Sequence, residues 1–288
     1  MNLTLVAMIS LGAIGLFLAI ILYLAAQKFK VFEDSRIDDI EAVLPGANCG
    51  GCGFAGCRNF ADECVRSKQF QKLLCPVGGT ETMMKVAAIL GKEAVPSDPT
   101  VAVLRCNGSC AHRPKTSVFD GASSCAVAAA TYGGDTDCSY GCLGLADCVN
   151  ICKFDAMTMN QETGLPEVIE DQCTSCGACV KACPKNLFEI RKKSPESIRI
   201  YVSCMNMDKG VVAKKACEVA CIGCGKCEKV CEFNAITITK NLAYIDFNAC
   251  TRCRKCVQVC PTMSITELNF PPRKQVEKIT VSEKESYV

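Results

Sequence analysis

The sequence contains no tryptophan and few other aromatic residues. Only 6% of its 288 residues are Phe, Trp or Tyr, and it has a single histidine, His112. Aromatic side chains provide much of the buried area in protein cores, so the domains need another source of stability. A Ser–His–Asp catalytic set would have to use His112, and nothing in the surrounding sequence supports one.

The chain also lacks an excess of charge of either sign. Its formal net charge is +2, and the lysines and arginines are spread along the sequence rather than gathered in one segment. Binding to nucleic acid relies on concentrated positive charge. We therefore expect no nucleic-acid partner.

Cysteine, in contrast, is abundant, with 26 residues. Many lie two residues apart on one stretch, a spacing that suits metal ligation and is poorly suited to disulfide bonds. Thiolate ligands need reduced thiols, which places this part of the chain in a reducing compartment. The bound metal would also supply folding energy, so metal-free protein should be poorly folded.

The most specific motif is the run from Cys173 to Pro184, which has the spacing C-x-x-C-x-x-C-x-x-x-C-P. This is the bacterial ferredoxin pattern, in which three cysteines hold one iron–sulfur cluster and the fourth ligates a second cluster. The same spacing recurs from Cys221 to Cys231 and from Cys250 to Cys260. The sequence therefore predicts several one-electron centres in one chain.

An internal repeat shows that two modules of this kind follow each other. The segment from Cys142 to Met159 aligns with that from Cys221 to Ile238. In such a module the fourth cysteine of each run ligates the cluster held by the other run, an arrangement that we call crossed ligation. It predicts two clusters in each module. In the second module the predicted ligand sets are Cys221, Cys224, Cys227 with Cys260, and Cys250, Cys253, Cys256 with Cys231. In the first module they are Cys173, Cys176, Cys179 with Cys152, and Cys138, Cys142, Cys148 with Cys183.

The last of these sets departs from the pattern. Leu145 occupies the position where the repeat has its middle cysteine, Cys224. Cys138, four residues before Cys142, is the replacement that we predict.

A separate cysteine motif precedes both modules. Cys49, Cys52 and Cys57 lie in a glycine-rich stretch and are completed by Cys75, which precedes a proline. The glycines allow the backbone to approach a cluster closely. We expect these four thiols to hold a fifth 4Fe–4S cluster.

Six cysteines remain after these assignments. Cys64 lies on one predicted helical face with Cys57, Phe60 and Ala61, which favours a small buried hydrophobic residue. For the others, a sixth cluster and buried free thiols are alternatives that the sequence leaves open. These five are Cys106, Cys110, Cys125, Cys204 and Cys217.

The N-terminal segment from Leu3 to Ala26 contains no charged residue. About 20 apolar residues suffice to cross a bilayer, so the segment is a candidate transmembrane helix. A cleaved signal peptide would need basic residues before it, and Met1-Asn2 supplies none. Lys28 and Lys30 follow it, which favours a single-pass anchor in the cytoplasmic membrane with the clusters on the cytoplasmic side.

These observations predict an α+β chain in five parts. Residues 1–27 form a transmembrane anchor and residues 28–95 form a stalk with a small helical 4Fe–4S domain. Residues 96–200 and 201–270 form two tandem ferredoxin-like modules of the bacterial two-cluster type. Residues 271–288 form a flexible tail.

The order of an apolar helix, the stretch Leu44-Pro-Gly-Ala-Asn-Cys-Gly-Gly-Cys-Gly-Phe-Ala-Gly-Cys57 and ferredoxin modules resembles the B subunits of Rnf complexes. The resemblance covers residues 1 to about 270 and corresponds to the long form with two modules. It implies a redox subunit of an ion-translocating ferredoxin:NAD⁺ oxidoreductase. It also implies partners: soluble ferredoxin, the membrane and the other subunits A, C, D, E and G.

Two rival functions remain distinguishable by experiment. A membrane-tethered polyferredoxin could serve another acceptor, such as a hydrogenase or a redox regulator, and only the partners would separate it from a member of an Rnf complex. A zinc-stapled interaction protein would be colourless, whereas cluster-containing protein is brown with reducible EPR signals. The triple cysteine runs with a remote Cys-Pro favour clusters over zinc.

Overall fold

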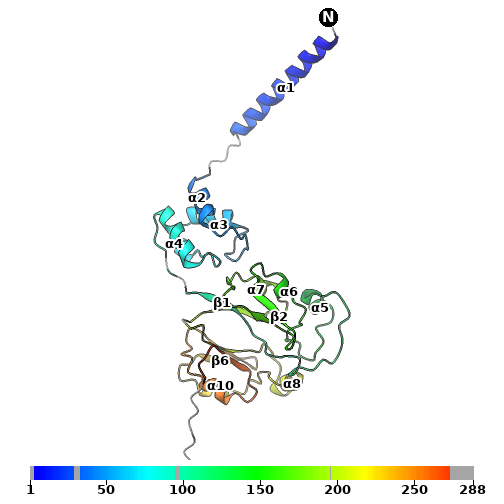
Figure 1. Ribbon diagram of the computed structural model, residues 1–288, viewed down its shortest axis with the longest axis vertical. Coiled ribbons are helices and arrows are strands. Elements are labelled where there is room, and N and C mark those ends of the chain that lie inside the picture. Colours follow the sequence, from blue (N-terminus) through cyan, green and yellow to red (C-terminus); the bar gives the residue numbers. More distant parts are fainter. Residues whose placement is uncertain (1–2, 29–32, 95, 97, 195, 273–288) are drawn as a thin grey trace, which may run out of the picture.

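A computed structural model describes residues 3–28, 33–94, 96, 98–194 and 196–272. From the N-terminus it comprises a long helix, a small group of helices, and two successive sets of short strands and helices (Figure 1). This mixed architecture, with ferredoxin-like modules after an apolar helix, confirms the predicted fold class. Most of the predicted tail, and Val95 at the first domain boundary, lie outside the described residues.

Helix α1, Leu3–Lys28, extends away from the rest of the chain (Figure 1). Its 26 residues span about 39 Å, more than the hydrocarbon thickness of a bilayer. Large apolar side chains such as Leu11 and Phe17 are exposed, at 70% and 64%. A helix that is apolar all round and covered by no other element is suited to a lipid environment.

The helical group contains α2 (Arg36–Val43), α3 (Cys57–Arg66), a 3₁₀ turn (Phe70–Lys72) and α4 (Gly79–Leu90). Its core is formed by side chains from all three α-helices, including Ile40, Phe60 and Val86. On α3 the buried residues are Phe60, Ala61 and Cys64, the helical face expected from their spacing. Gly91 ends α4 in the left-handed conformation, with φ +62°, which glycine adopts at low cost.

The first strand set holds two antiparallel pairs. Strand β1 (Thr100–Leu104) pairs with β4 (Phe188–Lys192), and β2 (Met157–Asn160) forms a hairpin with β3 (Leu165–Val168). Three short helices connect them: α5 (Cys125–Thr131), α6 (Asp147–Asn150) and α7 (Ala178–Ala182).

The second strand set repeats this topology, as the internal repeat leads one to expect. Strand β5 (Arg199–Val202) pairs with β8 (Ile265–Leu268), and β6 (Ile236–Thr239) pairs with β7 (Leu242–Ile245). Its helices are α8 (Gly210–Ala216), α9 (Lys226–Lys229) and α10 (Lys255–Val259). In both sets the outer strands enclose a hairpin and the cysteine-bearing loops.

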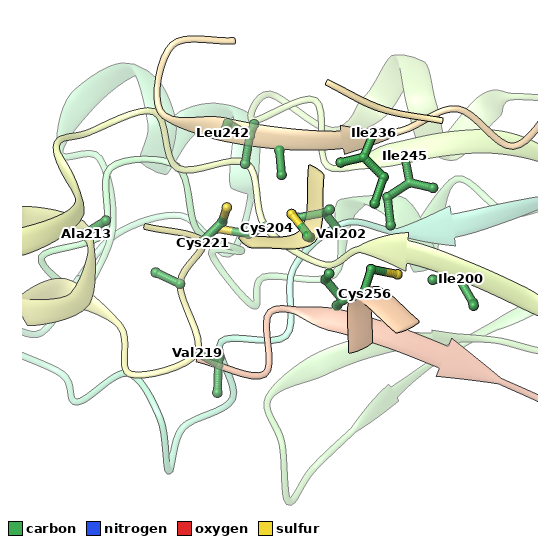
Figure 2. Packing of buried hydrophobic residues seen from close by; sticks show 14 of the residues in the cluster. Ile200, Val202, Cys204, Ala213, Val219, Cys221, Ile236, Leu242, Ile245 and Cys256 are labelled. Carbon is green, nitrogen blue, oxygen red and sulfur yellow. The ribbon is translucent and has the colours of Figure 1, made fainter. Parts of the chain in front are cut away.

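Cysteines are part of the core of the second set rather than additions to its surface. Figure 2 shows Cys204, Cys221 and Cys256 among aliphatic side chains such as Val202 and Ile245. Apart from the cysteines, the buried residues of this cluster are Ile, Val, Leu and Ala, so the thiols and the group that they bind take the place of aromatic side chains in holding the strands together. This arrangement accounts for a fold with hardly any aromatic core.

We predict that Ile40→Ala destabilises the helical group by about 2–5 kcal/mol, because Ile40 is fully buried and its truncation leaves a cavity. Hydrogen exchange of the α2–α4 amides, measured by mass spectrometry on the full chain, should show a matching fall in opening free energy. Met84→Ala on the exposed face of α4 is the control. Equal protection in both variants would contradict the packing described here.

Candidate metal centres

Four thiols of the N-terminal motif surround one cavity, an arrangement that we call a cage. Cys49, Cys52, Cys57 and Cys75 line this cavity together with apolar residues. The Asn48 side chain accepts a hydrogen bond from the Cys57 backbone N–H at 2.8 Å and so fixes the start of α3. The Gly78 N–H lies 3.4 Å from the Cys75 sulfur. The structure thus brings together all four cysteines predicted for this site.

In the first module, one cage differs from the expectation based on the sequence. Cys125 lines a cavity with Cys142, Cys148 and Cys183, and Cys138 does not. The reason lies in Asp147 at the start of α6, whose carboxylate accepts hydrogen bonds from the Ser124 hydroxyl and the Ala126 N–H, both at 3.0 Å. These hydrogen bonds hold the beginning of α5 against α6. As a result Cys125 occupies the fourth position of this cage, for which the spacing predicts Cys138.

Cys138 belongs instead to a cage that joins the two modules. It lines a cavity with Cys106, from the first module, and with Cys204 and Cys217, from the second. The ligand sets predicted from spacing leave Cys106, Cys204 and Cys217 unassigned. The internal repeat carries a signal for this cage, because Cys106 corresponds to Cys204 and Cys138 to Cys217.

Asn206 provides hydrogen bonds to this inter-module cage. It is 1% exposed, its backbone N–H lies 3.4 Å from the Cys204 sulfur, and its side-chain N–H₂ lies 3.6 Å from the Cys138 sulfur. Two donors directed at sulfur from one buried residue are suited to a thiolate acceptor. Arg113 also lines the cavity and brings positive charge to it.

Two further sets lie in the second module. Cys231, Cys250, Cys253 and Cys256 line one cavity. Burial, and then the neighbouring thiols of Cys221, Cys260 and Cys224, raise the pKa of Cys227 to about 11. Those four thiols are the other set expected from crossed ligation.

The remaining predicted set lies in the first module. The pKa of Cys179 is raised to about 12 by burial and by the adjacent Cys173 and Cys176. Cys152 packs with Cys173 and Cys179 in the same cluster of side chains. The crossed pattern therefore brings this set together as well.

Burial makes these thiols poor anions unless they bind a cation. It raises the pKa of Cys142, Cys148 and Cys204 to about 12 in each case. Metal coordination deprotonates a thiol outright, so bound iron would stabilise the same side chains as thiolates. Cys260 is the exception. Burial alone would raise its pKa, but hydrogen bonds to its sulfur, including one with Ser264 at 3.3 Å, lower it.

The chemistry of these sites fits iron–sulfur clusters. Within the described residues, no three His, Cys, Asp or Glu side chains converge on a point where a single ion would bind. The thiols instead stand around cavities, and backbone N–H groups reach several of the sulfurs. A cube of iron and sulfide needs this wider arrangement of four thiolates.

The cages also adjoin one another. A side chain at Gly51 would come within 2.7 Å of the Cys176 carbonyl oxygen, so the N-terminal cage packs directly on the first module. The Lys181 ammonium donates to the Gly50 carbonyl at 3.4 Å across the same contact. The Cys221 backbone donates a hydrogen bond to the Cys204 thiol, so the inter-module cage adjoins the set of thiols that includes Cys221.

Two cysteines lie outside every cage. Cys64 is fully buried in the core of the helical group, where desolvation raises its pKa to about 12, and Cys110 is exposed. Cys64 thus packs as the small hydrophobic residue that its helical spacing indicated.

Three family models match the segments that carry these cages. Residues 44–76 match a putative Fe-S cluster family, residues 166–189 a 4Fe-4S binding domain, and residues 220–264 a 4Fe-4S dicluster domain. Together they cover the N-terminal motif and part of each ferredoxin-like module.

Longer similarities extend over most of the chain. It is 43% identical to the B subunit of the Na(+)-translocating ferredoxin:NAD(+) oxidoreductase complex of Acetobacterium woodii, over 86% of this chain and 73% of that protein. It is 40% identical to the B subunit of the ion-translocating oxidoreductase complex of Methanosarcina acetivorans, over 82% and 88%. It is 38% identical to the B subunit of the proton-translocating ferredoxin:NAD(+) oxidoreductase complex of Clostridium ljungdahlii, over 85% and 85%.

The cages, the three segments that match iron–sulfur families and the extent of these similarities lead to one conclusion. The chain belongs to the family of B subunits of ion-translocating ferredoxin:NAD⁺ oxidoreductase (Rnf) complexes, in which it is an iron–sulfur redox subunit.

Proposed function

We propose that this chain accepts electrons from reduced ferredoxin and delivers them to the membrane subunits of an Rnf complex. The observation that carries the proposal is the series of neighbouring cages. It extends from the second module, through the inter-module cage, to the glycine-rich loop between α2 and α3. The names of the Acetobacterium woodii and Clostridium ljungdahlii relatives support ferredoxin as the donor. All three names describe a subunit of a complex, which supports further subunits as partners.

The proposed cofactor content is six 4Fe–4S clusters, one more than the minimum expected from the sequence. The N-terminal cage is Cys49, Cys52, Cys57 and Cys75, and the inter-module cage is Cys106, Cys138, Cys204 and Cys217. The first module holds Cys125, Cys142, Cys148 with Cys183, and Cys152, Cys173, Cys176 with Cys179. The second holds Cys221, Cys224, Cys227 with Cys260, and Cys231, Cys250, Cys253 with Cys256.

When bound, each cluster supplies one-electron redox chemistry. The chain supplies the rest. Its loops leave nearly all of these thiols buried or half-buried, its N–H and hydroxyl groups hydrogen-bond several of the sulfurs, and a glycine allows two neighbouring cages to approach closely. Gly51 is the clearest case, since any side chain there would push the N-terminal cage away from Cys176.

The position of helix α1 in the chain indicates which cage lies nearest the membrane. It is long and apolar enough to cross a bilayer, and every cage lies on its C-terminal side. Lys28 at its end supports a cytoplasmic location for the modules by the positive-inside rule. In this arrangement the N-terminal cage is nearest the membrane and passes electrons to the complex, with subunits A, C, D, E and G as the proposed partners.

Cys52→Ala tests this proposal, because it removes one thiol from the cage next to the membrane. We expect membranes with this variant to lose ferredoxin-dependent NAD⁺ reduction, while the distal clusters remain reducible by ferredoxin in EPR spectra. Cys110→Ala, outside every cage, is the control. Undiminished NAD⁺ reduction by the Cys52 variant would refute the proposed route.

Iron content tests the ligand sets of the two unexpected cages. Cys125→Ser and Cys138→Ser should each lose about four iron atoms per chain, since a 4Fe–4S cluster depends on its thiolates. The double variant should lose about eight, because the two thiols line different cavities. Iron and sulfide analysis of anaerobically purified protein would show this, with Cys110→Ser as the control. A loss of only about four iron atoms in the double variant would contradict two separate cages. It would favour the ligand set expected from the sequence, in which Cys138 joins Cys142, Cys148 and Cys183.

Ser264 should tune the cluster ligated by Cys260. Its hydroxyl lies 3.3 Å from the Cys260 sulfur, and hydrogen bonds to sulfur raise the potential of a cluster. Ser264→Ala should therefore make that potential more negative in an EPR-monitored redox titration. The control is Ser203→Ala, whose equally buried hydroxyl contacts Thr266 instead of sulfur. Equal potentials in both variants would show that this contact has no electronic effect.

A further inference from the structure

A basic cleft of about 250 Å³ lies beside the loop that bears the last cysteine run. Its walls come from the end of β4, the segment leading into β5, and the turn after β7. Five cations and one carboxylate line it: Arg191, Lys192, Lys193, Arg199, Arg252 and Asp98. None of the ligand sets and none of the similarities described above assigns a role to this cleft.

The charge of its side chains is only partly cancelled by ion pairs. Arg191 and Arg199 are 1% and 5% exposed and pair with Glu189 and Glu170, neither of which lines the cleft. Lys192 pairs with Asp98 at 2.9 Å. The Lys193 ammonium donates to a backbone carbonyl at 2.7 Å, and Arg252 has no ion pair within the described part of the chain. The side chains of the cleft therefore retain net positive charge, and low-dielectric walls focus the resulting electric field.

The cleft shares a wall with a cage. Cys250 lines both the cleft and the cavity that it forms with Cys231, Cys253 and Cys256. Cys253 is exposed. The intervening residues include Arg252, Arg254 and Lys255, whereas the corresponding stretch of the first module, 174–178, carries no charge.

We propose that this cleft is the docking site for carboxylate side chains of a small acidic electron-carrier protein, and that electrons enter through the Cys250–Cys256 cage. The inference rests on the proposed function and adds to it the site of entry. Carboxylates from a partner's surface complement the lysines and arginines, and the exposed Cys253 places the cage near the surface where such a partner would bind. The Cys250–Cys256 run is the last of the cysteine runs and the most distant from α1 in the sequence.

The charge-reversal variants Arg252→Glu and Lys192→Glu test the site on the full chain in detergent, with a two-cluster bacterial ferredoxin as the probe. Lys214→Glu on α8 is the matched control, since Lys214 is exposed and lies outside the cleft. Binding of ferredoxin, and separately of inorganic phosphate, is measured at low and moderate ionic strength. The rate of reduction by pre-reduced ferredoxin is measured by stopped-flow absorbance, and iron content is measured for every variant.

Each cleft variant should raise the Kd for ferredoxin about tenfold at low salt and reduce its salt dependence, because steering by a focused field is electrostatic. Iron content and reduction by dithionite should match those of the unmodified chain. Lys192→Glu, outside the cysteine run, separates docking from any change in cluster assembly. The Lys214 variant should bind like the unmodified chain.

Three results would overturn the docking site. The first is affinity in both cleft variants equal to that of the Lys214 control. The second is loss of inorganic phosphate binding in the cleft variants without loss of ferredoxin affinity, which would make the cleft a site for a free anion. The third is equal loss in all three variants. If even the unmodified chain were not reduced by ferredoxin, the proposed function itself would fail.

Discussion

Convergence of four thiols on one cavity is the constraint on which the rest of the structure depends. In every set that we assign, at least one cysteine comes from a segment distant in sequence from the others, as Cys75 does for the N-terminal motif. Closing a cage therefore closes a loop of the chain. The aliphatic cores are small, so the ligated metal supplies much of the energy that keeps these loops closed. The same thiols that would ligate the redox-active clusters therefore also maintain the fold.

Much of this could be predicted from the sequence because local spacing determines local geometry. The C-x-x-C-x-x-C loops, the helical face on α3 and the stop at Gly91 are short-range patterns, and the structure shows each of them. The paired strands of the two modules follow from the internal repeat, although their register does not. Crossed ligation follows from known chemistry of the motif and not from any local pattern.

The altered cage of the first module is where spacing misleads, and the reason is physical. With Leu145 in place of a cysteine, the choice between Cys125 and Cys138 depends on how α5 is positioned. That position is set by hydrogen bonds from Ser124 and Ala126 to Asp147, more than twenty residues away. Proximity in sequence favours Cys138, whereas this tertiary contact brings in Cys125. Correspondence between the repeats is the better guide, because it pairs Cys138 with Cys217, which line the same cavity.

The boundary between the modules is held by buried charge as well as by apolar contact. Arg191 lies within about 5.6 Å of the rings of Tyr201, Tyr244 and Phe247, and donates to the Ile245 carbonyl at 3.2 Å. The Arg105 guanidinium, in the first module, donates a hydrogen bond to the Val202 carbonyl, in the second module. A buried ionic network is stable only in one arrangement, since each displaced partner leaves a desolvated charge. An apolar interface of similar size tolerates sliding, and sliding would change the distances between cages. The arginines thus give the inter-module cage, which takes two thiols from each side, the fixed boundary that it needs.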